Sequence, residues 1–143
     1  MRSFSSDQGG RIIVVRMTRG ELLREAILEA IQKEKIRNGS ILSGLGTLET
    51  CTLHMVTNSE YPPTEAYPHW ETPLELVSVT GIIADGEPHI HAVVGDERGA
   101  YAGHLENNCK VLFLAEIVIF EHEALPLKRV KENGIPALVP AEE

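Results

Sequence analysis

The sequence predicts a single α+β domain, built on an antiparallel sheet of about seven strands with one main N-terminal helix. Two features lead to this class. Residues 22–33 carry apolar side chains at helical spacing, whereas most later segments are short, β-branched and either alternating or wholly apolar. The chain has 143 residues, a length that fits one domain with its own core. We expect a flexible arm at residues 1–10, the domain at 11–131 and a tail at 132–143.

The composition argues against membranes and against direct binding to nucleic acids. The formal net charge is −8, with 13 basic and 21 acidic residues, so DNA is repelled unless the basic residues gather on one face. No apolar run approaches membrane length, and no basic segment followed by an apolar one marks a secretory signal. Cys51 and Cys109 lack Cys-x-x-Cys spacing, which favours two reduced thiols in a cytoplasmic protein.

The first part of the domain predicts a buried strand followed by the helix. Arg11–Met17 is a short, mostly apolar run of the kind found in buried strands. Thr18 and Glu21 have the spacing of a capping box, with Thr18 as the N-cap. The helix then presents one apolar face, and Asn38-Gly39 is a typical C-terminal signal.

From Ser40 the apolar residues recur at every second position. Ser40–Gly46 and Leu48–Thr57 are predicted as two strands, the second of which alternates through Thr50, Thr52 and His54. Asn58–Thr72 holds three prolines and is predicted to be a long loop. Its aromatic residues, Tyr61, Tyr67 and Trp70, either cover a pocket or a neighbouring subunit or pack on their own domain. Leu74–Ala84 is predicted to be another strand.

The most apolar run, Lys110–Phe120, is predicted to be the central strand. Glu116 stands in its middle, where a buried carboxylate is costly unless it is paired or hydrogen-bonded. We therefore expect Glu116 to face a polar site or a partner. Glu123–Val130 is predicted as a last edge strand, a position that suits Pro126.

The segment from Gly86 to Leu105 predicts a hairpin that gathers histidines. His89–Gly95 alternates as a strand, and Asp96–Gly99 is polar and ends in glycine, as hairpin turns do. Residues two apart on a strand share a face, so His89 and His91 point the same way. An even-numbered turn centred between residues 97 and 98 then places His91 opposite His104, with Cβ atoms roughly 5 Å apart.

Three imidazoles at one spot predict a metal site on His89, His91 and His104. Catalytic zinc sites use such a set of three protein ligands and leave one position open. An odd-numbered loop would turn His104 to the other face and remove the site. The alternative is that these histidines are half-buried polar residues of the hairpin, satisfied by hydrogen bonds.

Several segments together resemble the PPC (plant and prokaryote conserved) domain family. The resemblance covers most of the chain from Arg11 to about Val130. It is carried by Gly86-Glu87-Pro88-His89-Ile90-His91-Ala92 and Gly103-His104-Leu105, then by Ala115–Ile119, Val15–Met17, Ile41–Gly46 and Leu74–Gly81.

The resemblance implies a small α+β domain with an antiparallel sheet that assembles as a homotrimer. In land plants the domain follows an AT-hook, which binds the minor groove of A·T-rich DNA, and stand-alone prokaryotic members carry a DNA-binding label by that analogy. The fold is also similar to acetolactate decarboxylase, where a His-x-His strand and a later histidine hold a catalytic zinc. Only His89, His91 and His104 map onto that pattern.

This sequence departs from the plant members of the family, because it has no Arg-Gly-Arg-Pro AT-hook and no basic arm in its place. These differences weaken the expectation that it binds DNA directly. Two functions stay open. The first is a homotrimeric binding or regulatory module whose histidines hold zinc or another divalent metal. The second is a zinc-dependent lyase or hydrolase acting on a small carbonyl-containing substrate, with Glu116 as acid/base or as the hydrogen-bond partner of a ligating histidine.

Overall fold

The computed structural model describes residues 2–6, 10–122 and 125–141. Nine strands form one sheet with the order β1-β2-β9-β3-β6-β7-β8, to which β4 and β5 are added through β3. Every strand pairing in it is antiparallel. Its strands are β1 (Arg2–Ser6), β2 (Arg11–Thr18), β3 (Gly39–Val56), β4 (Glu65–Ala66), β5 (His69–Trp70), β6 (Leu74–Ala84), β7 (Glu87–Asp96), β8 (Gly99–Leu105) and β9 (Lys110–Glu121).

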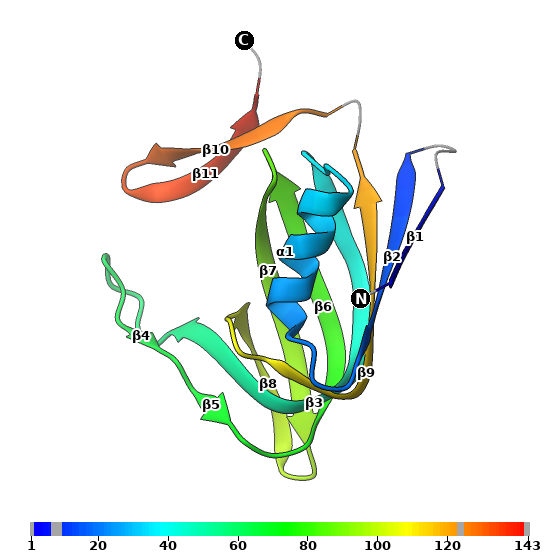
Figure 1. Cartoon of the computed structure of the whole chain (residues 1–143). Helices are drawn as coiled ribbons and strands as arrows, with labels where there is room; N and C mark the ends of the chain where they lie inside the picture. Colours follow the sequence, from blue (N-terminus) through cyan, green and yellow to red (C-terminus); the bar gives the residue numbers. More distant parts are fainter. Residues whose placement is uncertain (1, 7–9, 123–124, 142–143) are drawn as a thin grey trace.

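One helix, α1 (Leu23–Lys33), lies across one face of the sheet (Figure 1). Its buried side chains are Leu23, Ala26, Ile27, Ala30 and Ile31. They pack with the inward-facing residues of the strands into one core, in which Ile117 and Ile119 of β9 are 0% exposed. β9 lies between β2 and β3, so the prediction of a central strand at 110–120 is confirmed.

The α+β class and the antiparallel sheet are confirmed, but the strands outnumber the seven expected. β1 lies within the predicted arm, and β4 and β5 lie within the predicted loop. Strand β11 (Ile135–Pro140) lies within the predicted tail and pairs with β10 (Leu127–Glu132). This two-stranded hairpin extends away from the main sheet (Figure 1). The edge strand predicted at 123–130 therefore begins later, and residues 123–124 lie outside the described part.

The two strands predicted at 40–46 and 48–57 are one strand, β3, and that prediction was wrong. A glycine within this strand allows the neighbouring strand to approach closely. Gly46 has φ +152°, and a Cβ there would lie 2.3 Å from the carbonyl oxygen of Leu114 on β9. The register of β3 against β9 shifts near this point, so the strand bends without ending.

The helix is shorter at both ends than the sequence signals predicted. Glu21 Oε2 accepts hydrogen bonds from Thr18 N at 2.7 Å and Thr18 Oγ1 at 2.9 Å, but this contact precedes the helix. The N-cap residue is Leu22, which makes no side-chain capping bond. The helix ends at Lys33, and Lys35 turns the chain with φ 56°, ahead of the expected Asn38-Gly39.

The face of the sheet opposite the helix is open in the single chain and carries exposed apolar residues. Leu45, Val77 and Phe113 are 53%, 61% and 65% exposed. Glu116 lies on this outer face and is exposed, which explains how the most apolar strand accommodates a carboxylate. Among the described residues, no helix has the length and apolar character needed to cross a membrane.

Candidate metal centre

The β7–β8 hairpin holds the predicted histidines in the predicted register. Gly95 pairs with Ala100, and His91 pairs with His104. Ile90 and Leu105, their neighbours along the strands, are 1% and 0% exposed in the core. Because successive residues of a strand alternate in direction, burial of these apolar side chains turns the histidines to the outer face. The predicted pairing is confirmed.

The three rings converge. The ring centroids lie 5.0 Å apart for His89 and His91, 5.1 Å for His89 and His104, and 5.6 Å for His91 and His104. The Nε2 atoms of His89 and His91 are 3.2 Å apart. Two ligands bound to one tetrahedral ion at about 2.1 Å lie about 3.4 Å apart, so this pair of nitrogens, which shares a hydrogen bond, also lies close to ligand spacing.

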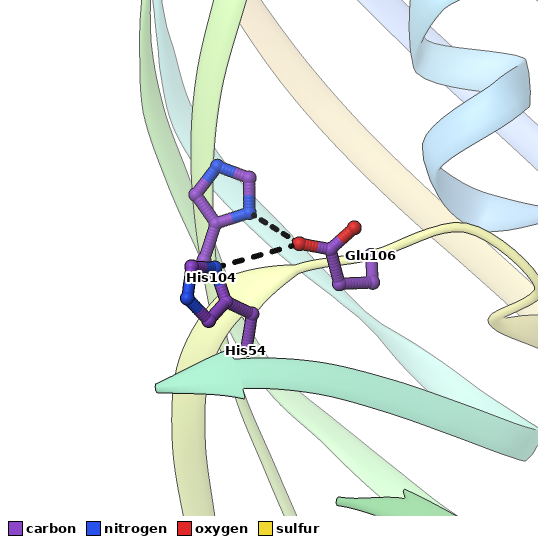
Figure 2. Close-up of side chains that lie close together, drawn as sticks. All are labelled: His54, His104 and Glu106. Atoms are coloured by element: carbon purple, nitrogen blue, oxygen red, sulfur yellow. Dashed lines mark ion pairs between the residues drawn. The ribbon is translucent and has the colours of Figure 1, made fainter. Parts of the chain in front are cut away.

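Two further residues, which the sequence did not single out as ligands, join the cluster from the opposite side of β8. His54 on β3 pairs directly with His104, and Glu106 follows the end of β8. Glu106 Oε1 lies 3.4 Å from Nδ1 of His104 and 3.6 Å from Nδ1 of His54 (Figure 2). Ligand atoms of these three residues all lie within 4.8 Å of one another, a spacing that one metal ion can bridge.

The loop before β5 supports His54 from outside. The ring of Tyr67 stacks on the imidazole of His54 with centroids 4.6 Å apart and planes inclined by 10°. Tyr67 donates a hydrogen bond to Glu65 Oε2 at 3.2 Å, and Glu65 Oε1 lies 3.3 Å from His54 Nε2. Trp70 packs on Tyr101 with ring centroids 4.7 Å apart. Two of the loop aromatics thus pack on their own domain, whereas Tyr61 is 63% exposed.

Glu116 does not join the histidines within the chain. β3 and β6 lie between its strand, β9, and the strand of His89 and His91. Three interstrand spacings amount to about 14 Å. The carboxylate beside the histidines is Glu106, so the expectation for Glu116 is not met inside one chain.

The protonated forms of two histidines are disfavoured. Partial burial lowers the pKa of His89, and the neighbouring His104 and His91 lower it further. Partial burial also lowers the pKa of His104, where Glu106 acts in the opposite direction. Neutral imidazole is the form that binds a metal, so the lowered pKa values of His89 and His104 favour the ligating form of these two residues.

Two hollows flank the cluster. One has a volume of about 440 Å³ and is lined by His54, Met55, Val56, His89, His91, Ala102, Gly103 and His104. The other, of about 450 Å³, lies on the β6 side of His89 and His91 and is lined also by Ser40, Leu42 and Thr80. A small molecule would have access to the histidines from either side.

The sequence did not identify His54 and Glu106 as ligands because neither belongs to a short metal-binding motif. The alternation of Thr50, Thr52 and His54 placed His54 on the polar face of its strand, and this was the available signal. The partner strand of β3 was not predictable from it, since β8 pairs with β3 from about 50 residues further along the chain.

Solved structures with the same fold are known. A protein from Bacteroides thetaiotaomicron, provisionally named a DNA-binding protein, has 19% identity and a TM-score of 0.81, covering 98% of this chain and 99% of its own. A metal-containing protein from Archaeoglobus fulgidus has 21% identity and a TM-score of 0.77, covering 99% and 100%. A plant- and prokaryote-conserved (PPC) protein from Pyrococcus horikoshii has 26% identity and a TM-score of 0.73, covering 99% and 97%.

The sequence of this chain is similar to part of one longer protein and to one domain family. The bifunctional protein GlmU of Synechococcus sp. strain JA-3-3Ab is 28% identical over 111 residues, or 76% of this chain, and the chain spans only 17% of that protein's length. Residues 4–123 match the family profile of the Plants and Prokaryotes Conserved (PCC) domain. This match covers most of the chain, and the chain therefore belongs to that family, the PPC domain family.

Proposed function

We propose that this chain is a homotrimeric binding or regulatory module that holds one divalent metal ion, most simply zinc, on His89, His91 and His104. One observation supports this proposal most directly. Three histidine rings from two paired strands converge within 5.6 Å of one another, with two Nε2 atoms only 3.2 Å apart. Without a metal, the Nε2 atoms of His89 and His91 share a hydrogen bond. With a metal, their spacing is that of a three-nitrogen site with an open position.

The homotrimer is supported by the open face of the sheet. Leu45, Val77 and Phe113 are each more than half exposed in the single chain. Apolar side chains that gather on one sheet face mark a protein–protein interface more often than a solvated surface. Assembly through this face would cover them.

DNA is a possible partner of such a trimer because the similar protein from Bacteroides thetaiotaomicron is provisionally named a DNA-binding protein. The net charge of −8 opposes it. A partner other than DNA therefore fits this chain better. A cytoplasmic location belongs to the same proposal and is supported by two free, buried thiols.

An enzyme is the second candidate function, and the hollow of about 440 Å³ beside the histidines favours it. A zinc-dependent lyase or hydrolase needs an open metal position next to a concave pocket. Similarity to the acetolactate decarboxylase fold would fit a small carbonyl-containing substrate. Glu106 lies beside His104. In this enzyme it would act as acid/base or as the hydrogen-bond partner of a ligating histidine, the role that the sequence suggested for Glu116.

The proposed site is tested by metal content. The purified protein is loaded with zinc, dialysed against a mild chelator and analysed for metal per chain. We expect His91→Ala to lose the ion bound by the three histidines while keeping its circular dichroism spectrum, because the core lies on the other face of the sheet. His122→Ala is the matched control. His122 bonds Ser40 Oγ through Nε2 at 3.1 Å and has no part in the cluster. Wild-type protein that retains no zinc after loading would overturn the proposal.

A further inference from the structure

We propose a second metal-binding position beside the first, formed by His54, His104 and Glu106. It rests on the proposed function in one respect, since it shares His104 with the three-histidine position. His54 and Glu106 belong to it alone. The occupant is a divalent cation that takes both nitrogen and oxygen ligands, for which zinc is the suitable test ion.

The distances within this group are those of metal ligands rather than of hydrogen bonds. Glu106 Oε1 lies 3.4 Å from His104 Nδ1 and 3.6 Å from His54 Nδ1. An N–H···O hydrogen bond is shorter, at about 2.7–3.2 Å. Two ligands held about 2.1 Å from one tetrahedral ion are separated by about 3.4 Å. One carboxylate oxygen therefore stands at ligand spacing from two imidazole nitrogens at once.

Two ring nitrogens in the group are buried and make no hydrogen bond. These are Nδ1 of His104 and Nε2 of His54. Leaving a buried polar atom unsatisfied costs about 1–3 kcal/mol, so native proteins rarely keep such atoms without a partner. An ion between His104, His54 and Glu106 would satisfy the nitrogen of His104 directly.

His54 is held in the orientation that a ligand needs. Its Nε2 faces Glu65 Oε1 at 3.3 Å, and the ring of Tyr67 stacks on it. Histidines that bind metals commonly direct the other ring nitrogen toward a carboxylate, which fixes the tautomer. With its proton on Nε2 toward Glu65, His54 presents an unprotonated Nδ1 to Glu106 and to the ion.

His104 connects the two positions. Its Nδ1 faces Glu106 (Figure 2), which leaves Nε2 for the ion shared with His89 and His91. When both ions are bound, the His104 ring bridges them and gives up its remaining proton to solvent, because each metal–nitrogen bond requires a lone pair. The structure thus points to a two-ion centre with one shared imidazole.

The experiment measures zinc per chain in wild type and four variants, after loading and dialysis against a mild chelator. We expect two ions in wild type and one in His54→Ala, Glu106→Gln and His89→Ala. His104→Ala should lose most of the metal because it contributes to both positions. Titration with cobalt(II), whose visible absorption reports tetrahedral nitrogen and oxygen ligation, should show two steps in wild type and one in His54→Ala.

Two matched variants control for nonspecific loss. His69→Ala and Glu71→Gln alter a histidine and a carboxylate whose side chains are 42% and 80% exposed outside the cluster, and both should keep two ions. Glu106→Gln nearly preserves the volume of the side chain. It therefore still tests the second position if His54→Ala fails to fold.

The remaining outcomes separate this inference from the proposed function. One ion in wild type that persists in His54→Ala and Glu106→Gln overturns the second position and leaves the three-histidine site intact. One ion that disappears in those two variants but persists in His89→Ala supports the position proposed here and overturns the first. One ion lost equally in all variants of the cluster overturns the existence of two separate positions.

Discussion

The Sγ atoms of Cys51 and Cys109 lie 3.7 Å apart in the core, although the two residues are 58 positions apart in the sequence. Both side chains are 0% exposed and both are free thiols. The contact with Cys109 and burial raise the pKa of the Cys51 thiol well above its ordinary value. The Cys51 thiolate is therefore scarce at neutral pH, and Cys109, whose pKa is lowered by its contact with Cys51, is shielded from reagents by its burial.

We expect the folded protein to react slowly with a disulfide reagent such as 5,5′-dithiobis(2-nitrobenzoate). The same protein should release two equivalents per chain within seconds once it is unfolded in guanidinium. Fast release from the folded protein would show that the pair is accessible, and fewer than two equivalents in denaturant would show that it had oxidised.

The metal-free protein should lose stability as the solution becomes acidic. The pKa values of His89 and His104 are lowered in the folded state, chiefly by burial. Below the unfolded value of about 6.5, the unfolded chain takes up protons that the folded chain resists, so protonation favours unfolding. This contribution is fully present above about pH 6.5 and is lost as the pH falls below it.

Urea unfolding of the metal-free protein between about pH 8 and pH 5 measures this effect. His89→Gln removes one of the two groups, so its free energy of unfolding should depend less steeply on pH than that of wild type. Equal slopes for both proteins would contradict the assignment of acid sensitivity to this histidine.

Close packing of β8 against β3 at Gly103 should be essential for the geometry of the cluster. A Cβ at Gly103 would lie 2.6 Å from the carbonyl oxygen of His54. Gly103→Ala therefore has to push the two strands apart, and we expect it to destabilise the protein by about 1–3 kcal/mol. The measurement is the free energy of unfolding in urea.

Gly99 provides the control on the same strand, because a Cβ there meets nothing within 4 Å. Gly99→Ala should leave the free energy of unfolding within about 0.5 kcal/mol of wild type. If both substitutions behave alike, the contact between β8 and β3 is less tight than the structure indicates.

Duplex DNA should bind weakly and only at low salt. The net charge of −8 repels phosphates, whereas specific DNA-binding proteins reach about 10⁻⁸ M or tighter at physiological salt. The dissociation constant is measured by fluorescence anisotropy at about 50 and 200 mM salt. One A·T-rich and one G·C-rich duplex are compared. Submicromolar, sequence-selective binding at the higher salt would refute the charge argument.

The chain should form a homotrimer at micromolar concentration, as multi-angle light scattering would show. Phe113 is 65% exposed on the open sheet face, so Phe113→Asp should shift the protein toward monomer by placing a charge in the interface. Leu138→Asp, on the separate β10–β11 hairpin, should leave the oligomer unchanged. A monomeric wild-type protein would rule out this assembly.

The sequence alone determined the parts of this protein that depend on local spacing. Strand alternation and a short polar turn were enough to place His91 opposite His104, because a hairpin sets its register through neighbouring residues. The apolar run at 110–120 identified the central strand because a long, mostly apolar run is typical of a strand in the interior of a sheet. The family resemblance rested on these same segments.

The tertiary structure alone decided which distant segments meet at the cluster. His54 reaches His104 only because β3 bends at its glycine-rich segment and pairs with β8 beyond the point where it leaves β6. Glu106 replaces Glu116 as the neighbouring carboxylate because sheet order sets β9 three strand positions from β7. Strand order is set by burial of the whole apolar face against α1, a sum over many side chains that no short motif contains.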